Sequence, residues 1–458
     1  MIKLNCWRSS VGKSERAKYS RTLKHVSTTR LRFAPAPTGS LHLGSARTAL
    51  FNWLVARGTG GQLILRIEDT NAELTRPELI DNIYRSLEWL QIGFDGEPVR
   101  QSERTDLYND AVEGWISDGL AYVDDGAVRF RVPSEGTTSW NDTVRGTVVF
   151  ENQHIEDFVV RRADGTATFF TANAVDDFDL GITHVVRGED LVNVTPKVIM
   201  LRQALGAEDM PEFAHLPLIV NEQRKKLSKR RDDVALESYR ERGVVAAAMI
   251  NYLALLGWGP PDDIEVRPVE EIAALFQLAD VNPSPAMFDV KKLESINGDY
   301  IRAMTQEEFS EALTPWLKNE IWGSSVDHDR LSQVAPLVQE RTRVLSEGPP
   351  QLDFFFLETP EIDQSAWEKV MTTDEAPLIL ESAKMAFETL EWDVDVLHES
   401  LRAIGESHDM KLGKAQAPIR VAVTGRLVGP PLFESMYALG RETVLERIAA
   451  AHTKLGAA

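Results

Sequence analysis

The chain has 458 residues, of which 43% are hydrophobic and 26% are charged, and its formal net charge is -20. This length is too great for one hydrophobic core and predicts about two to four domains. The composition excludes disorder throughout, and no apolar run approaches the roughly 20 residues of a membrane span. The only cysteine, Cys6, excludes a disulfide framework and any multi-cysteine zinc site.

The first 30 residues differ in charge from the rest of the chain. They contain eight Lys or Arg and one acid, Glu15, so residues 31–458 carry a charge of -27. We predict that residues 1–29 are a disordered basic leader of a cytoplasmic protein, with an organellar transit peptide as the alternative. The acidic body does not exclude a nucleic-acid partner, because salt screens charges beyond about 8 Å and local patches then decide.

Residues 30–125 predict alternating strands and helices. A strand at 31–34 leads into a Pro/Gly turn, and the helix after it places apolar residues such as Ala46, Leu50 and Leu54 on one face. A second strand at 63–67 and a second amphipathic helix at 79–90 follow. This order predicts a parallel sheet that binds ligands at the carboxyl ends of its strands.

Short extended runs at 128–132 and 147–150 predict a small β-rich insertion that splits this first domain. Strand signals resume at 183–186 and 216–220. From about residue 232 onward the periodicity is mostly helical.

The first chemical motif is the segment 35–45, which lies between a strand and a helix. The amide hydrogens of a helix N-terminus suit a polyphosphate, and His42 can donate to a phosphate oxygen. Gly44 lets a purine base lie against bare backbone. The alternative interpretation is a tight turn capped by Ser40 with an incidental histidine.

The second motif is the segment 224–231, with six cations in eight residues. An ammonium such as that of Lys229 can neutralise charge that develops on a phosphate as pyrophosphate leaves. The alternative is a solvated basic surface. We expect the two motifs to close around one triphosphate, so Nε2 of His42 and Nζ of Lys229 would share that ligand.

Together these motifs resemble the signatures of class I aminoacyl-tRNA synthetases, specifically the bacterial-type glutamyl family. Residues 42–45 are similar to its HIGH motif and residues 226–230 to the KLSKR form of its KMSKS motif. Further segments, including 66–70, 174–177, 182–190 and 251–258, resemble family segments in family order. The resemblance covers about residues 30–450.

The resemblance implies a fold and a domain order: an α/β Rossmann-like catalytic domain with a small β-rich insertion, then an all-α anticodon-binding domain. The implied boundaries are 30–106 and 172–231 for the catalytic domain, 107–171 for a shortened acceptor-end-binding insertion, 232–305 for a stem-contact helical region, and 306–458 for the anticodon-binding domain.

The resemblance also implies the site residues. His42 and Lys229 would be catalytic. The ATP-binding residues would be Pro35, Thr38, Gly39, His42, Gly44, Ser45, Lys226, Leu227, Ser228, Lys229 and Arg230. The glutamate-binding residues would be Arg32, Ala34, Glu68, Phe169, Asn173 and Arg187. A guanidinium suits the side-chain carboxylate of glutamate and an acid suits its ammonium, which fits Arg187 and Glu68 respectively; the alternative is a structural ion pair between those two.

Three departures from the family pattern concern this pocket. Phe169 stands where a tyrosine is usual, Leu191 replaces a frequent aromatic residue, and Ala36 replaces a frequent serine. Losing one hydrogen bond costs about 0.5–1.5 kcal/mol, which predicts weaker glutamate binding without abolishing it.

The expected activity is glutamate–tRNA ligation: glutamate and ATP give glutamyl-adenylate and diphosphate, and the glutamyl group passes to the 3' end of tRNA(Glu). The resemblance implies a monomer that uses ATP with Mg²⁺, binds no zinc and no membrane, and generally needs tRNA for activation; tRNA(Gln) is a second candidate substrate. The rivals are a glutaminyl enzyme, a truncated tRNA-modifying paralogue, and a tRNA-binding protein with a decayed pocket.

Overall fold

The computed structural model describes residues 28–71, 73, 75–227 and 234–456. It divides the chain into two compact units. The first consists of the chain up to Arg240 together with residues 246–290, and the second consists of residues 241–245 together with the chain from Lys291 onward. The leader up to residue 27 and the motif residues Ser228, Lys229 and Arg230 lie outside the described residues. Among the described helices, none combines the length and hydrophobicity needed to cross a bilayer.

The first unit is built on strands that run in parallel. β1 (Arg30–Phe33) pairs with β2 (Gln62–Ile67), which pairs with β3 (Val99–Arg100). A second sheet has the order β7-β6-β10-β9, in which β9 (His184–Gly188) and β10 (Glu212–Leu216) are parallel. The backbone N–H of Thr183 donates to the Arg30 carbonyl at 2.9 Å, so β9 begins beside the start of β1. The carboxyl ends of β1, β2 and β9 therefore lie at one edge of the unit.

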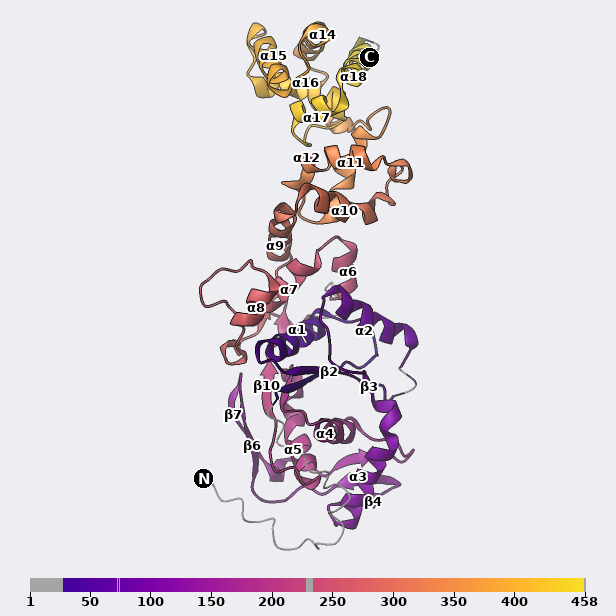
Figure 1. Ribbon diagram of the computed structural model, residues 1–458, viewed down its shortest axis with the longest axis vertical. Coiled ribbons are helices and arrows are strands. Elements are labelled where there is room, and N and C mark those ends of the chain that lie inside the picture. The colour runs from indigo at the N-terminus through magenta and orange to yellow at the C-terminus, as the bar shows by residue number, and fades with distance from the viewer. Residues whose placement is uncertain (1–27, 72, 74, 228–233, 457–458) are drawn as a thin grey trace. The chain divides into compact units, whose positions relative to one another are not determined.

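The helices of this unit cover both sides of the strands. The predicted apolar face of α1, with Ala46, Leu50 and Leu54, is buried, and so are most of the other residues of this helix, including Arg47 and Asn52. Figure 1 shows α1 and α4 on opposite sides of β2. The helices are α1 (Leu43–Gly58), α2 (Pro77–Trp89), α3 (Thr105–Ser117), α4 (Phe169–Asp179), α5 (Thr195–Ala204), α6 (Leu236–Glu241), α7 (Ala246–Leu255) and α8 (Val269–Leu275).

The insertion contributes to two sheets. β4 (Ala121–Asp124), β5 (Ala127–Phe130) and β8 (Phe158–Arg161) form an antiparallel sheet of their own. The hairpin of β6 (Thr137–Asp142) and β7 (Gly146–Glu151) instead extends the β9–β10 sheet, because β6 pairs with β10. Part of the predicted insertion is thus continuous with the sheet that carries Arg187.

The single strand predicted at 216–220 is wrong. The chain there forms β10, which ends at Leu216, and β11 (Ile219–Val220), which pairs with β12 (Ala286–Met287). Pro217 lies between them, and a proline cannot donate a ladder hydrogen bond.

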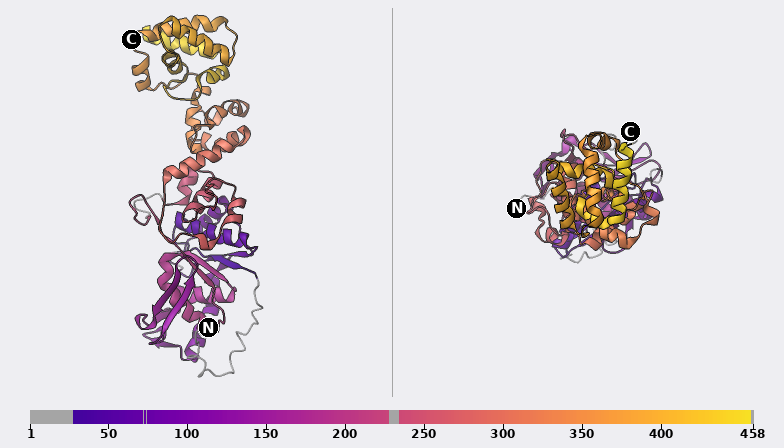
Figure 2. Two further views of the ribbon diagram at one scale, coloured as in Figure 1. Left: turned by 90° about the vertical axis from the view of Figure 1, so that its left-hand side faces the viewer. Right: turned by 90° about the horizontal axis from the view of Figure 1, so that it is seen from above.

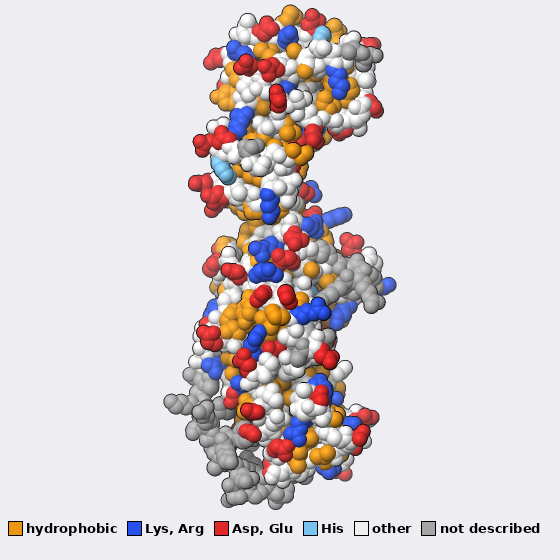
Figure 3. Space-filling view, turned by 90° about the vertical axis from the view of Figure 1, so that its right-hand side faces the viewer, with side chains coloured by type: hydrophobic (Ala, Val, Ile, Leu, Met, Phe, Trp, Pro, Cys, Tyr) orange, Lys and Arg blue, Asp and Glu red, His pale blue; other side chains and the backbone are white. Residues whose placement is uncertain are grey.

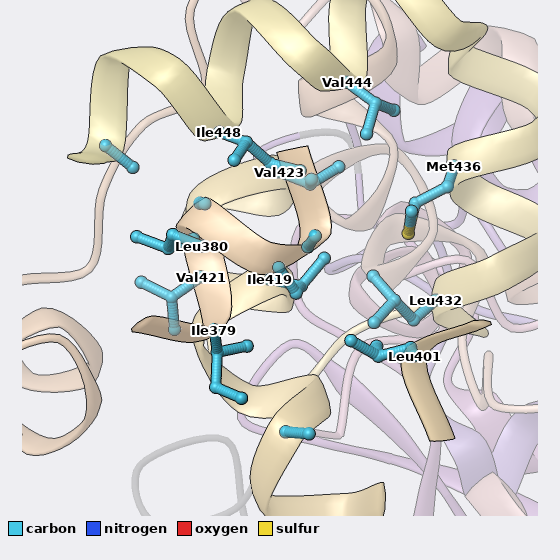
Figure 4. Packing of buried hydrophobic residues seen from close by; sticks show 14 of the residues in the cluster. Ile379, Leu380, Leu401, Ile419, Val421, Val423, Leu432, Met436, Val444 and Ile448 are labelled. Atoms are coloured by element: carbon cyan, nitrogen blue, oxygen red, sulfur yellow. The ribbon is translucent and has the colours of Figure 1, made fainter. Parts of the chain in front are cut away.

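The second unit is mostly helical in its described residues. Its helices are α9 (Val290–Ala303), α10 (Gln306–Leu317), α11 (His328–Val334), α12 (Pro336–Gln339), α13 (Gln364–Val370), α14 (Glu375–Thr389), α15 (Val394–Ser407), α16 (Leu412–Thr424), α17 (Leu432–Leu439) and α18 (Arg441–Gly456). Figure 2 shows the C-terminal helices packed against one another, and Figure 4 shows their core, where Ile379, Leu401 and Ile419 meet side chains such as Met436 and Ile448.

Candidate active site

The first motif forms the N-terminus of α1. His42 is the N-cap, and its Nδ1 accepts the backbone N–H of Ser45 at 3.2 Å. This corrects the alternative in which Ser40 caps the helix. Because Nδ1 accepts, a neutral ring carries its hydrogen on Nε2, which lies 3.1 Å from Oγ of Ser45. A side chain at Gly44 would crowd the imidazole at 3.2 Å, so Gly44 gives the ring room.

The segment that follows the second motif pairs with the first motif. Leu227 donates its backbone N–H to Ile219 at 3.2 Å, and Nζ of Lys226 lies 3.9 Å from a carboxylate oxygen of Asp190. Beyond residues 228–233, Ala235 forms an antiparallel bridge with His42. The backbone on the far side of the basic motif is therefore bonded to the helix N-terminus that carries His42, while Lys229 itself lies outside the described residues.

A buried cluster of charges joins the ends of β1 and β2 to α4. Nε of Arg32 donates to Asp177 at 3.1 Å, and Nη1 of Arg66 reaches the same carboxylate at 2.5 Å. Nη2 of Arg66 contacts Glu68 at 2.9 Å, and Asn173 donates to Glu68 at 3.4 Å. The structure thus links Arg32, Glu68 and Asn173, three of the predicted glutamate-binding residues, through Asp177 and Arg66.

The two arginines fix the ionisation of Asp177. Burial alone would raise the pKa of this carboxyl, but the charges of Arg32 and Arg66, with a further contribution from Arg202, outweigh it and lower the pKa to about 2. Burial likewise opposes the charge of Arg66, and Asp177, Glu68 and Asp176 more than offset it, so the pKa of Arg66 is raised. The positive and negative charges of this cluster therefore compensate one another within the protein.

Arg187, near the end of β9, has a different environment. Its side chain is only 4% exposed. Nε donates to Nε2 of His215 at 3.2 Å, and Nη2 donates to Oγ1 of Thr195 at 2.7 Å and to the Leu191 carbonyl at 3.4 Å. Nη1 has no hydrogen-bond partner among the described residues.

No carboxylate in the described part of the chain lies within ion-pairing distance of Arg187, so the alternative of an ion pair with Glu68 is wrong; Glu68 pairs with Arg66. Burial, followed by the nearby charge of Arg32, lowers the pKa of Arg187 to about 9, although the more distant Asp177 and Glu68 act in the opposite direction. A buried cation without an anionic partner and with one unpartnered nitrogen is suited to bind an anionic ligand.

The remaining predicted residues lie around the same edge. Ala34 and the buried Pro35 follow β1, and the Pro35 carbonyl accepts the backbone N–H of Glu68 at 3.0 Å. Thr38 and Gly39 lie in the turn that leads to α1, and Phe169 is the first residue of α4.

The sequence places Arg66 and Asp177 in family-like segments without predicting a role for either, and nothing in it points to His215. Asn173, Asp176 and Asp177 stand at i, i+3 and i+4 in a helix whose other residues are mostly apolar, and this spacing was a usable signal for a buried polar face. His215 follows two buried residues in β10 and carried no such pattern.

The comparisons with known proteins agree with this geometry. Residues 28–127 and 124–295 match the family described as tRNA synthetases class I (E and Q), catalytic domain, and residues 308–452 match the anticodon binding domain family. The parallel α/β unit and the helical unit are those of a class I aminoacyl-tRNA synthetase.

The relatives define the family more narrowly. A glutamate–tRNA ligase of Frankia casuarinae is 50% identical, covering 93% of this chain and 98% of that protein, and one of Thermobifida fusca is 46% identical over 94% and 98%. The crystal structure of a glutamate tRNA ligase from Elizabethkingia meningosepticum in complex with its amino acid has a TM-score of 0.84 at 28% identity, covering 93% of this chain and all of that one. The chain belongs to the glutamate–tRNA ligase family.

Proposed function

We propose that this chain activates glutamate with ATP to glutamyl-adenylate and transfers the glutamyl group to the 3' end of tRNA(Glu). The observation that carries the proposal is Arg187, a buried arginine with neutral protein partners and an unpartnered Nη1 at the ligand edge of the sheet. The side-chain carboxylate of glutamate satisfies both the charge and the geometry of this group. The amide of glutamine would leave the charge uncompensated, which disfavours a glutaminyl enzyme.

The α4 side of the pocket completes glutamate binding. Glu68 is positioned by Arg66 and Asn173, and in our proposal its carboxylate faces the α-ammonium. Arg32, fixed by Asp177, assists with anionic groups of glutamate and the adenylate. Ala34 and Phe169 form the walls of the site.

ATP binds, in our proposal, at the N-terminus of α1 with Mg²⁺ held by its phosphates. The cap places the hydrogen of neutral His42 on Nε2, which contacts Oγ of Ser45 in this structure and in our proposal turns to a phosphate oxygen when ATP binds. Pro35, Thr38, Gly39, Gly44 and Ser45 shape the binding loop. Residues 226–230 supply the opposing cations, chiefly Lys229. The glutamate carboxylate attacks the α-phosphorus, so the chain contributes alignment and charge stabilisation rather than a nucleophile.

The rest of the chain would bind tRNA. We assign the acceptor end to residues 107–171, the stem to 232–305 and the anticodon to the helical unit from residue 306. On the face drawn in Figure 3, acidic and basic side chains are interspersed, so binding would depend on local groups rather than on one continuous basic surface. The monomeric state, the cytoplasmic location, the absence of zinc and the use of tRNA(Gln) stay predictions.

The test is ATP–pyrophosphate exchange with glutamate, with and without tRNA. We expect exchange with glutamate and tRNA present, and none when glutamine replaces glutamate. No exchange under any condition, with tRNA binding intact, would leave the tRNA-binding protein as the better assignment.

The Lys229→Ala variant separates catalysis from tRNA binding. We expect it to slow adenylate formation by about 100-fold or more, because the cation acts on charge that develops in the transition state. Its tRNA affinity, measured by filter binding, should change less than about threefold. The reverse pattern would mean that the basic motif serves tRNA.

A further inference from the structure

A buried histidine stands directly behind Arg187. His215 is completely buried in β10, opposite Arg187 in the parallel register of β9 and β10. Its Nε2 faces Nε of Arg187 at 3.2 Å and Oγ1 of Thr195 at 3.0 Å. Its Nδ1 lies 2.5 Å from Asp142, a buried residue at the end of β6.

The donors and acceptors in this chain define one proton arrangement. An arginine only donates hydrogen bonds, so Nε2 of His215 must accept from Nε of Arg187. The ring is then neutral with its hydrogen on Nδ1, which donates to Asp142. Burial lowers the pKa of His215 and favours this neutral ring, and the backbone amides of Val144, Arg145 and His215 also donate to Asp142, which keeps the carboxylate ionised and fixed.

We infer that His215, oriented by Asp142, is a positioning residue that directs Nη1 of Arg187 toward the substrate carboxylate and preserves the positive charge of the arginine for it. This inference rests on the proposed function. It adds a second layer to the pocket, in which an imidazole separates Asp142 from Arg187.

The separation of Asp142 from Arg187 keeps the positive charge of Arg187 available to a ligand. A carboxylate in direct contact with Arg187 would compensate its charge, as Asp177 does for Arg66 on the other side of the pocket. A neutral imidazole accepts the Nε hydrogen without doing so. The other charges near the ring are Arg145, which pairs with Glu189, and Arg187 itself, and the rings of Trp140 and Phe213 fix its plane.

Each of two amide substitutions of His215 preserves one of its two hydrogen bonds and removes the other. The amide of His215→Gln reaches the position of Nε2 and can still accept from Arg187, but it loses the donor to Asp142. The amide of His215→Asn reaches the position of Nδ1 and keeps the donor to Asp142, but Arg187 loses its acceptor. A positioning role predicts that His215→Asn raises the KM for glutamate about tenfold or more, and that His215→Gln raises it less than about threefold.

The experiment is pyrophosphate exchange with tRNA present, measuring KM for glutamate, KM for ATP and kcat for each variant, with thermal unfolding measured in parallel. KM for ATP should stay within about twofold. The control is His184→Asn in the same sheet, where the imidazole contacts Thr183 and Glu212 instead of the pocket; it should leave KM for glutamate unchanged.

The outcomes distinguish a failure of this inference from a failure of the proposed function. Absence of exchange in the unsubstituted protein overturns the proposed function. Normal exchange there, with equal KM values for the Asn and Gln variants or changes that follow only their thermal stability, overturns the positioning role alone. If His215→Asn does not fold, His215→Gln together with Thr195→Val decides: loss of the hydroxyl that accepts from Nη2 should raise KM for glutamate several-fold, and an unchanged KM in the Thr195 variant overturns the role.

Discussion

The buried arginines on the two sides of the candidate glutamate pocket have partners of opposite kinds, carboxylates on one side and neutral groups on the other. On the α4 side, Arg32 and Arg66 both contact Asp177, and Arg66 also contacts Glu68. On the β9–β10 side, Arg187 contacts an imidazole, a hydroxyl and a carbonyl. Burial of an arginine therefore does not identify a ligand contact by itself. The chemistry of its partners is the better guide, because a guanidinium without a carboxylate partner has more charge to offer a ligand than one that is paired, such as Arg32.

Removal of the compensated arginine should produce the largest effect. Arg66→Met removes one of the two ion pairs of Asp177 and the ion pair of Glu68, while Asp176 keeps Arg104, so we expect the free energy of unfolding to fall by about 3–5 kcal/mol. Chemical denaturation measures this. The control Arg129→Met removes an exposed pair with Asp124 and should cost less than about 1 kcal/mol. Equal losses in both variants would show that the cluster does not stabilise the fold.

Removal of the uncompensated arginine should affect binding instead. Arg187→Met deletes a buried charge without a counterion, so we expect little loss of stability. The KM for glutamate in pyrophosphate exchange should rise by about 100-fold, since charge-paired contacts are worth about 2–5 kcal/mol. A large loss of stability with an unchanged KM would place Arg187 among the structural arginines and remove the contrast between the two sides.

Strong acid should weaken the α4 side by protonating Asp177. The folded pKa of Asp177 is about 2, below its ordinary value of 3.8, so its stabilising effect is complete above about pH 4 and is lost as the pH falls toward 2. The shift corresponds to stabilisation on the order of 2 kcal/mol. Denaturation curves between pH 7 and pH 2 measure it, and Asp177→Asn should be less stable at neutral pH and less sensitive to acid. A pH dependence identical to that of the unsubstituted protein would contradict this role.

The residues of the site differ in how far the sequence alone could predict their positions and partners. The position of His42 at a helix N-terminus follows from a local strand, turn and helix, whereas Arg187 is assigned through the family resemblance of its segment, with its place at a strand end in agreement. The Asp177 cluster joins residues more than 100 positions apart, so no local pattern predicts its pairing. Asp142 reaches His215 only because β6 joins the β10 sheet, and a strand register of that kind depends on tertiary packing.

The smallest change tests whether the α4 side can be improved. Phe169→Tyr adds a hydroxyl at the first residue of α4, one turn before Asn173, whose Oδ1 has no partner among the described residues. One neutral hydrogen bond is worth about 0.5–1.5 kcal/mol, so KM for glutamate should fall by roughly two- to tenfold. The neighbouring Phe170→Tyr is the matched control, because its ring packs on Phe158 and Lys197 instead, and it should leave KM unchanged. If both tyrosines leave KM unaltered, the phenylalanine costs the pocket nothing, and glutamate binding depends on the arginine side.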